Sequence, residues 1–310
     1  MPVHWYYDRT ALHADYGAVD QYLKPHPVHP GSILHRSAYT ALNEKGDILR
    51  EQAAYWGRTG VHYHQFLQAG ENTLNFQLAR ALHGLVARTG TYDPDAWLEC
   101  YIKFMLTPGL HRDTYVEEYH RAFFTHYSQG KKPRACGIND NHIGGLATVP
   151  ALCAALPGAE ETVVRAAVRE HVSLTHNNPA VLRAADLLAR LLTAVKNGLP
   201  LRAALTALAG EFFSERKALS YETQPDETII GRMFSPACYI DEAFPAALYL
   251  VWKYHQDFSA GIIANAHCGG DNCHRGGVIG ALLGAACGVP DQWVTGLLTP
   301  PPLPAAPAIN

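Results

Sequence analysis

Residues 267–288 have the sequence HCGGDNCHRGGVIGALLGAACG, and this stretch decides the fold more than any other. Gly269 and Gly270 interrupt the helical pattern before them and permit a tight turn. After the turn, Gly280 and Gly284 lie four residues apart on one helical face, where small side chains let another backbone approach closely. The stretch therefore predicts a turn that leads into a tightly packed core helix.

Apolar residues recur at helical spacing through most of the chain from Thr73 onward. Leu74, Leu78 and Leu82 form one such stripe, which ends before a glycine. No run of residues alternates in the manner of strands, so we expect an all-α protein. Helices are predicted over residues 74–88, 93–107, 113–127, 143–156, 160–174, 179–196, 201–217, 240–255, 259–266, 274–287 and 291–298.

The first 70 residues lack this periodicity and are rich in His, Tyr, Pro and Gly. We expect them to form an irregular loop layer, with a helix or hairpin near residues 37–54. No shift in composition marks a domain boundary, so residues 1–298 are expected to form one compact multi-helix domain. The Pro-rich tail, residues 299–310, is expected to be extended or disordered.

The composition is that of a globular protein with neither a membrane nor a nucleic-acid partner. Of the 310 residues, 48% are hydrophobic and 17% are charged, and the net charge is -3. No apolar run reaches the ~18–20 residues of a membrane helix, and the opening MPVHWYYDRT is no secretory signal. No long basic run indicates binding to nucleic acid. The seven cysteines are an odd number, which predicts reduced thiols and a cytoplasmic location.

The glycine turn gathers residue types that ligate metals. They are His267, Cys268, Asp271, Asn272, Cys273 and His274. Taken alone, Asp271 is an ordinary helix N-cap, because an Asp at a helix start accepts hydrogen bonds from free backbone amides. Thiolates and imidazoles favour Zn²⁺, although a C-x4-C spacing flanked by His is no standard zinc pattern. Carboxylate and amide oxygens favour Mg²⁺ or Ca²⁺ instead.

The same block resembles the C-terminal signature of the ADP-ribosylglycohydrolase family, Gly-Gly-Asp-Thr-Asp-Thr followed by a small-residue helix. Residues 69–82, 144–150, 171–179 and 237–271 resemble further parts of the family in the right order. The opening MPVHWYY resembles the end of the family's first motif, so the resemblance implies that the family's first helix is missing from this sequence. It also implies an all-α hydrolase fold, in which acids and a threonine hold a pair of Mg²⁺ ions.

The chain departs from the family at the expected metal ligands, so the resemblance implies a divergent member with degenerate metal motifs. In the first motif, Glu71 and Asn72 stand where two aspartates are expected, while Thr73 matches. In the second motif Asp271 matches, and the replaced positions are Asn272, Cys273 and His274. The family's Gly-Asn-Gly phrase falls on Asn141, His142 and Ile143. Of the four expected carboxylates, Glu71 and Asp271 remain.

The resemblance and the retained residues assign a candidate site. We expect Glu71 and Asp271 to be the catalytic carboxylates, because a carboxylate can stabilise an oxocarbenium-like charge or activate water. The candidate metal ligands are Glu71, Asn72, Asp271, Asn272 and Cys273. Since two carboxylates leave two Mg²⁺ ions poorly neutralised, we expect one Mg²⁺ ion or none. The candidate substrate-binding residues are Asn72, Thr73, Asp140, Asn141, His142, Gly269, Gly270 and His274.

Three functions follow from these assignments. The first is a hydrolase that cleaves an N- or O-glycosidic bond of a small-molecule or protein-linked ADP-ribosyl substrate, with altered or reduced metal dependence. The second is a family member without catalysis that binds a nucleotide or serves a structural role, as lens crystallins of this family do. The third is a glycosyl hydrolase for a different ribosyl substrate. The retained acids favour an enzyme.

Overall fold

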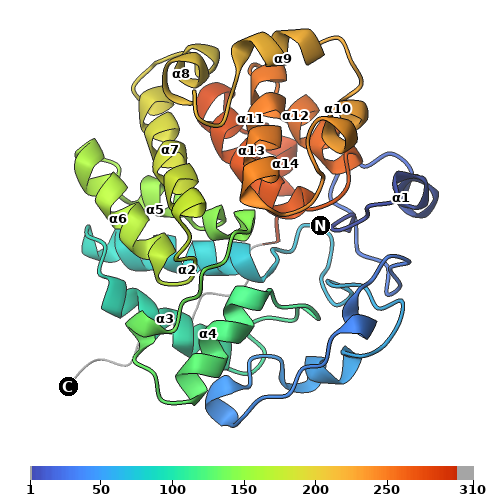
Figure 1. Ribbon diagram of the computed structural model, residues 1–310, viewed down its shortest axis with the longest axis vertical. Helices are drawn as coiled ribbons and strands as arrows, with labels where there is room; N and C mark the ends of the chain where they lie inside the picture. The colour runs from blue at the N-terminus through green and yellow to red at the C-terminus, as the bar shows by residue number, and fades with distance from the viewer. Residues whose placement is uncertain (1, 299–310) are drawn as a thin grey trace.

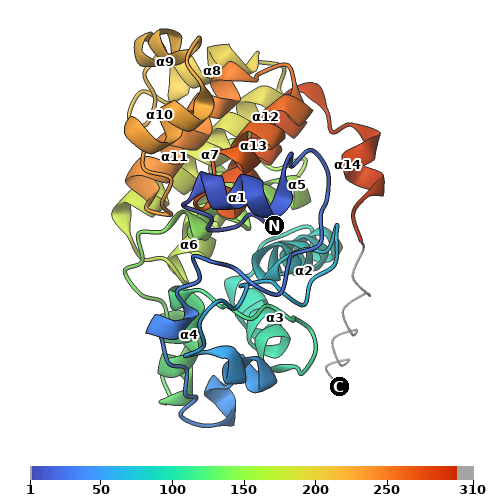
Figure 2. The same cartoon turned by 90° about the vertical axis from the view of Figure 1, so that its right-hand side faces the viewer.

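The core of the fold is formed by α7 (Pro179–Lys196), α11 (Ile240–Lys253) and α13 (Asn272–Cys287), which pack against one another. The structure is a computed structural model and describes residues 2–298. The long central run of α11 is buried on every face, as expected of a helix surrounded by others. Figures 1 and 2 both show these three helices side by side.

The predicted small-residue helix is present, but Gly280 does not make the closest contact, because a Cβ there would lie 3.5 Å from the side chain of Ile262. Its partner is α12 (Phe258–His267), which lies directly against α13. A Cβ added to Gly261 of α12 would overlap the side chain of Leu283 on α13. The two helices therefore approach closely only because glycine occupies the contact.

A second layer lies below this core in Figure 1 and is built on α2 (Leu74–Thr89). The predicted leucine stripe of α2 is buried, and the helix ends at Gly90, whose φ of 72° places it in the left-handed region. This helix packs against α3 (Pro94–Leu106) and α5 (Val149–Ala155). The start of α2 is thereby fixed close to the core.

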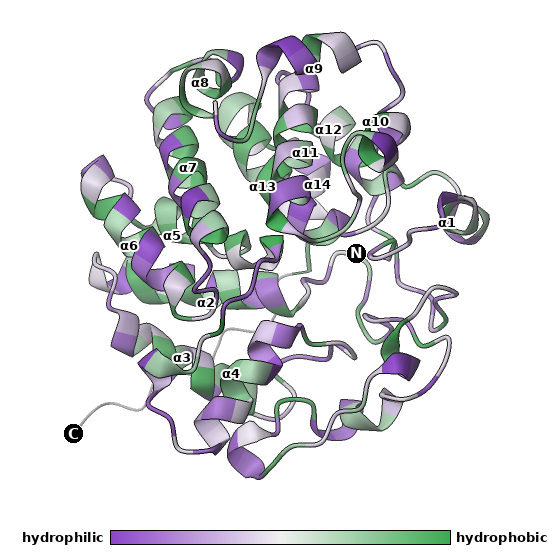
Figure 3. Ribbon diagram, in the orientation of Figure 1, coloured by the Kyte–Doolittle hydropathy of each residue, from purple (hydrophilic) through white to green (hydrophobic). Residues whose placement is uncertain are grey.

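The remaining elements are short and lie around these two layers. The other α-helices are α1 (Arg9–Tyr16), α4 (Glu118–Ser128), α6 (Glu161–Ser173), α8 (Leu201–Leu208), α9 (Glu215–Tyr221), α10 (Asp226–Arg232) and α14 (Asp291–Thr295). The 3-10 helices are η1 (Leu34–Arg36), η2 (Glu44–Gly46), η3 (Arg50–Tyr55), η4 (Pro133–Ala135) and η5 (Ile143–Leu146). In Figure 3, α9 is largely hydrophilic, which fits its place at the edge of the molecule.

The N-terminal layer crosses the face of the core at which α13 begins. The backbone N–H of Trp5 donates to the carbonyl of Gly270 at 2.8 Å, and the N–H of Gly270 donates to the carbonyl of Tyr6 at 2.8 Å. Pairings such as Val28 with Val61 are isolated bridges, and residues 2–298 contain no strand. The all-α class is confirmed, and the irregular N-terminal layer is present apart from one helix.

Two helices, α1 and α10, are present although the spacing of apolar residues did not predict them. The single helix predicted over residues 201–217 is wrong, because the chain turns between α8 and α9 and Ser214 caps a new helix there. Residues 37–54 hold only short 3-10 helices. No helix among residues 2–298 combines the length and apolarity needed to cross a membrane. The predicted tail lies outside the described residues.

Candidate functional site

The site begins at the turn that the paired glycines make before α13. Gly269 and Gly270 have φ values of 66° and 62°, which L-residues with a side chain rarely adopt. A Cβ on Gly270 would also overlap the carbonyl of Pro236, to which the N–H of Asp271 donates at 2.9 Å. The turn therefore requires glycine, and it places Asp271 at the N-cap of α13, where the carboxylate accepts from the N–H of His274 at 3.3 Å.

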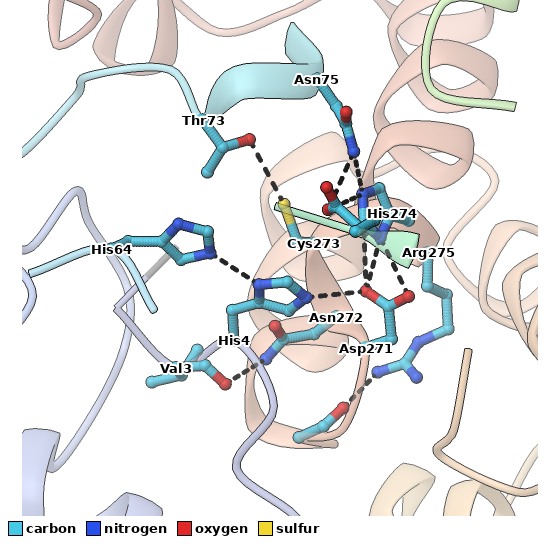
Figure 4. A network of polar contacts seen from close by, with 12 residues as sticks. Val3, His4, His64, Thr73, Asn75, Asp271, Asn272, Cys273, His274 and Arg275 are labelled. Carbon is cyan, nitrogen blue, oxygen red and sulfur yellow. Dashed lines mark hydrogen bonds and ion pairs between the residues drawn. The ribbon is translucent and has the colours of Figure 1, made fainter. Parts of the chain in front are cut away.

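Asp271 lies between two imidazoles from distant parts of the chain. Its Oδ1 is 3.0 Å from Nε2 of His4 and 2.9 Å from Nδ1 of His274, and its Oδ2 is 3.0 Å from the same Nδ1. All three side chains are buried, and that of Asp271 is 0% exposed. Figure 4 shows the carboxylate facing both rings. Its oxygens are therefore engaged within the protein.

On the far side of His274 the network reaches a second carboxylate. Nε2 of His274 lies 3.4 Å from Oε1 of Glu117 and 2.6 Å from the amide nitrogen of Asn75. That amide also donates to Oε1 of Glu117 at 3.0 Å, and its oxygen accepts from the hydroxyl of Tyr119 at 2.8 Å. The side chain of Glu117 is 17% exposed. Glu117 is thus the carboxylate of this network that reaches solvent.

On the far side of His4 a further imidazole–carboxylate pair extends the network. Nδ1 of His4 is 2.7 Å from Nε2 of His64, and Nδ1 of His64 is 2.5 Å from Oδ1 of Asp113. The other oxygen of Asp113 accepts from the backbone N–H of Leu74 at 2.9 Å. Because Leu74 is the first residue of α2, this carboxylate satisfies a free amide at a helix start. One chain of contacts thus joins the starts of α2 and α13.

The electrostatics divide the network into a charged inner group and an outer pair. Burial alone would raise the pKa of the Asp271 carboxyl, but the imidazoles of His274 and His4 hold it well below the ordinary value. Burial would lower the pKa of His274, yet Asp271 and Glu117 raise it well above the usual range. Although burial opposes it, contact with His274 lowers the pKa of Glu117 to about 2. Asp271 and Glu117 therefore favour the protonated form of His274.

The outer pair, His64 and Asp113, is less charged than the inner group. Burial raises the pKa of Asp113 to about 7 and lowers the pKa of His64 well below its ordinary value. Burial likewise lowers the pKa of His4, against the opposing effect of Asp271. Perturbed titratable groups gathered in this way are typical of functional sites.

The residues predicted from the first metal motif line a cavity of about 280 Å³ beside this network. Its polar lining includes Glu71, Asn72, Thr73, Asn272 and Cys273, and its apolar wall includes Phe76, Phe258, Ile262, Trp293 and Leu297. The structure therefore brings five of the predicted site residues to one cavity. Asp271 and His274 lie behind them, in the buried network.

Several of these predicted residues have partners within the protein. Both carboxylate oxygens of Glu71 contact Arg112 at 2.5 Å. The amide of Asn272 donates to the carbonyls of Val3 and Ala266, each at 3.1 Å. The hydroxyl of Thr73 lies 3.8 Å from Sγ of Cys273 (Figure 4), and burial raises the pKa of that thiol to about 11.

The predicted residues Asp140, Asn141 and His142 form a separate cluster before η5. Oδ1 of Asp140 accepts from the backbone N–H of His142 at 2.8 Å and lies 2.7 Å from its Nδ1. The hydrogen bond that His142 donates to the Asp140 carboxylate raises the pKa of His142 to about 10. The carbonyl of Asn141 accepts from the N–H of Ile240 at 2.8 Å, and the His142 ring stacks on Tyr239. This cluster anchors the loop to the start of α11.

The donor set at the network differs from the one that Mg²⁺ prefers. The ligand atoms of His4, Asp271 and His274 lie within 4.8 Å of one another, and this is the buried group of that kind among residues 2–298. Glu71 and Cys273 belong to no such group within the described chain. Two nitrogens and one carboxylate suit a borderline ion, whereas Mg²⁺ prefers oxygens. The residues present therefore do not fit a pair of Mg²⁺ ions.

A second group of three, His13, Glu227 and His267, lies near the surface. Nε2 of His267 accepts a hydrogen bond from the N–H of Val19 at 3.0 Å, which leaves the proton of a neutral ring on Nδ1. The guanidinium of Arg9 lies 3.7 Å from Glu227 and already provides a cation there. These contacts compete with a metal for the same atoms.

Sequence reasoning missed five residues of the network, which are His4, His64, Asn75, Asp113 and Glu117. His4 and His64 are 60 residues apart, and His4 and Asp271 are 267 apart, so no local spacing joins them. A usable signal was the His-Tyr-His run at residues 62–64 within a loop layer, because buried polar rings need partners.

Helices pack around α13, which follows the glycine turn and starts at the buried Asp271. This architecture defines an all-α class of fold that is found in known structures. A solved structure named "ADP-ribosylglycohydrolase-related protein complex" is similar to this chain, with a TM-score of 0.55 and 21% identity over 75% of this chain and 78% of that one. The family model for ADP-ribosylglycohydrolase matches residues 4–306. The chain belongs to the ADP-ribosylglycohydrolase family. No protein with a curated function matches it.

Proposed function

We propose that this protein is a hydrolase that cleaves the glycosidic bond of an ADP-ribosyl or related ribosyl group. Membership of the family supports glycohydrolase-type chemistry. The observation that carries the proposal is Glu117, a partly exposed carboxylate that His274 keeps ionised. An ionised carboxylate is the group that such chemistry requires, because the bond breaks through an oxocarbenium-like state.

The proposed roles follow from burial. Glu117 is the candidate catalytic residue, since its carboxylate can face the positive charge that develops at the anomeric carbon. His274 and Asp271 are positioning residues, because both are buried and act on the substrate only through Glu117. Glu71 lines the neighbouring cavity and is the second candidate, although its ion pair with Arg112 must open before it can act.

No step of this proposal passes through Mg²⁺. The acid that the family motif retains is already bound by two imidazoles, so a metal would have to displace His4 or His274 from Asp271. A hydrolase that uses Glu117 and His274 instead has reduced metal dependence. Turnover that is unchanged by EDTA is therefore expected.

Release of ADP-ribose from N- and O-linked ADP-ribosyl peptides tests the proposal, with Mg²⁺ and with EDTA. A Glu117→Gln variant is expected to lose about 100-fold or more in turnover, because the developing charge loses its carboxylate. Glu118→Gln is the matched control, since Glu118 is exposed and has no ion pair within residues 2–298. Full turnover by Glu117→Gln together with loss in Glu71→Gln would move the catalytic role to Glu71. No release by the wild-type chain would overturn the enzyme proposal.

A second candidate function is binding of a nucleotide without turnover, and one observation favours it. The carboxylates retained from the metal motifs, Glu71 and Asp271, are both engaged by cationic or imidazole partners. Thermal unfolding with ADP-ribose separates the two functions, because a ligand at about 100 times its dissociation constant adds about 2.7 kcal/mol to stability. Stabilisation by ADP-ribose without release from any peptide would support the binding role.

A further inference from the structure

A second and larger cavity, of about 680 Å³, adjoins the cavity beside the network, and Gln68 lines both. It is lined by η3, by residues 65–68, and by the end of α3 together with the segment that follows it, residues 105–112. None of its lining residues belongs to the network or to the candidate metal ligands. The cavity therefore needs an explanation of its own.

The lining of this cavity is basic. It holds four basic side chains, Lys24, Arg50, Arg58 and Arg112, against one acidic side chain, Glu51. Arg112 is paired with Glu71, which lies outside the lining. Within residues 2–298, Lys24, Arg50 and Arg58 have no carboxylate within 4.0 Å. Three cations without a carboxylate partner around one cavity favour an anionic ligand.

Two buried polar atoms in the cavity wall also lack partners. They are Nε of Arg50 and Nδ1 of His111. Nε2 of His111 donates to the carbonyl of Ile48 at 2.8 Å, so the neutral ring presents Nδ1 as an acceptor. Burial lowers the pKa of His111, which favours that neutral form. Two lining residues thus carry one unpaired donor and one unpaired acceptor, and a buried polar atom without a partner is costly.

The backbone of Arg50 is strained in a way that supports a binding role. Its φ of 50° lies in the left-handed region, which residues with a side chain rarely occupy. The conformation is held by Asp47, whose carboxylate accepts from the N–H of Arg50 at 2.9 Å. The guanidinium is held by the carbonyl of Leu106 at 2.5 Å. Strain that neighbours maintain in this way is typical of functional positions.

We propose that this cavity binds a phosphorylated sugar. Arg58 and Lys24 meet the phosphate, because guanidinium and ammonium groups are the usual partners of phosphate oxygens. The Nε–H of Arg50 donates to the ligand, and Nδ1 of His111 accepts from a sugar hydroxyl, which a simple inorganic anion such as sulfate lacks. The ring of Tyr55 lies under the guanidinium of Arg58, 5.3 Å from its central carbon, and keeps Arg58 at the cavity.

Isothermal titration calorimetry with ribose 5-phosphate, ribose and sulfate tests this site on the full chain. Ribose 5-phosphate is expected to bind with a dissociation constant of about 1 mM or below, sulfate about tenfold more weakly, and ribose not measurably. Higher ionic strength is expected to weaken binding, since the partly exposed cations are screened. Sulfate that binds as tightly as ribose 5-phosphate would overturn the sugar assignment.

Variants locate the binding. A double variant, Lys24→Gln with Arg58→Gln, is expected to weaken ribose 5-phosphate at least about tenfold, because two charge-assisted contacts are lost. Arg183→Gln is the matched control, since Arg183 is 53% exposed and pairs with Glu211 away from the cavity. Unchanged affinity in the double variant, or no binding of ribose 5-phosphate at about 10 mM by the wild type, would overturn the proposal.

Discussion

Replacing Glu117 with Gln removes one of the two carboxylates that flank His274 while keeping the side chain's size. Gln retains an oxygen that can accept from the amide of Asn75, which lies 3.0 Å from the present carboxylate. The substitution therefore tests the charge of Glu117 rather than its packing. The side chain is 17% exposed, so solvent screens this charge only in part.

The expected magnitude follows from the pKa of Glu117. A fall from the ordinary 4.5 to about 2 corresponds to about 3 kcal/mol of stability at neutral pH. Because the folded pKa is depressed, this stability is present above pH 4.5 and is lost as the pH falls towards 2. Glu117→Gln is thus expected to be about 3 kcal/mol less stable than the wild type at pH 7. At pH 3 the expected loss of stability is about half of that.

Urea unfolding of both proteins at pH 7, 4 and 3 measures this difference. Glu118→Gln, at the neighbouring exposed position in the first turn of α4, is expected to lose less than about 1 kcal/mol, as for a helix-start charge. A difference between Glu117→Gln and wild type that stays constant across this pH range would refute the reasoning. A difference below about 0.5 kcal/mol at pH 7 would show that His274 does not stabilise the ionised carboxyl.

Three further outcomes are expected. Gly270→Ala should lose more than about 2 kcal/mol in urea unfolding, because its Cβ meets Pro236, whereas Gly17→Ala, also at positive φ but in open space, should lose about 1 kcal/mol. Iodoacetamide should modify exposed Cys287 within minutes and leave buried Cys273 unmodified in the folded protein. Mass spectrometry measures the labelling, and equal labelling of the two cysteines would mean that the site opens readily. Neither Mg²⁺ nor EDTA should move the thermal midpoint by more than about 1 °C, since imidazoles already satisfy Asp271, and a larger shift with Mg²⁺ would contradict the fit of the donor set.

The helical spacing of apolar residues and the residues that cap or break helices predict the long helices, because both signals are local. The leucine stripe of α2 and the Asn178 cap that opens α7 both lie within one or two turns of the helix they define. The prediction of one helix over residues 201–217 is wrong for the same reason. The apolar spacing of these residues continues through the turn, and only Gly210 and Ser214 mark the break.

The candidate site was predicted only where the family resemblance supplied it. Asp271 was found because a glycine turn and a helix start surround it in sequence. His4 and Glu117 were not predicted as site residues, since neither belongs to a motif and each reaches the site only through tertiary packing. Whether Glu71 is free or paired also depends on Arg112, which no pattern around residue 71 indicates. Such partners follow from the fold and not from local sequence.

The threading of residues 2–6 across the glycine turn also constrains the order in which the protein folds. Trp5 and Tyr6 exchange backbone hydrogen bonds with Gly270, so this contact closes a loop of nearly the whole chain. During synthesis at about 10 residues per second, the N-terminal segment waits on the order of half a minute for its partner to emerge. Closing so long a loop is entropically costly, and its contacts cannot form early. The contacts of residues 2–6 with the glycine turn are therefore expected to form after the N-terminal half of the helical core, and His4 lacks its Asp271 partner until residue 271 has been synthesised.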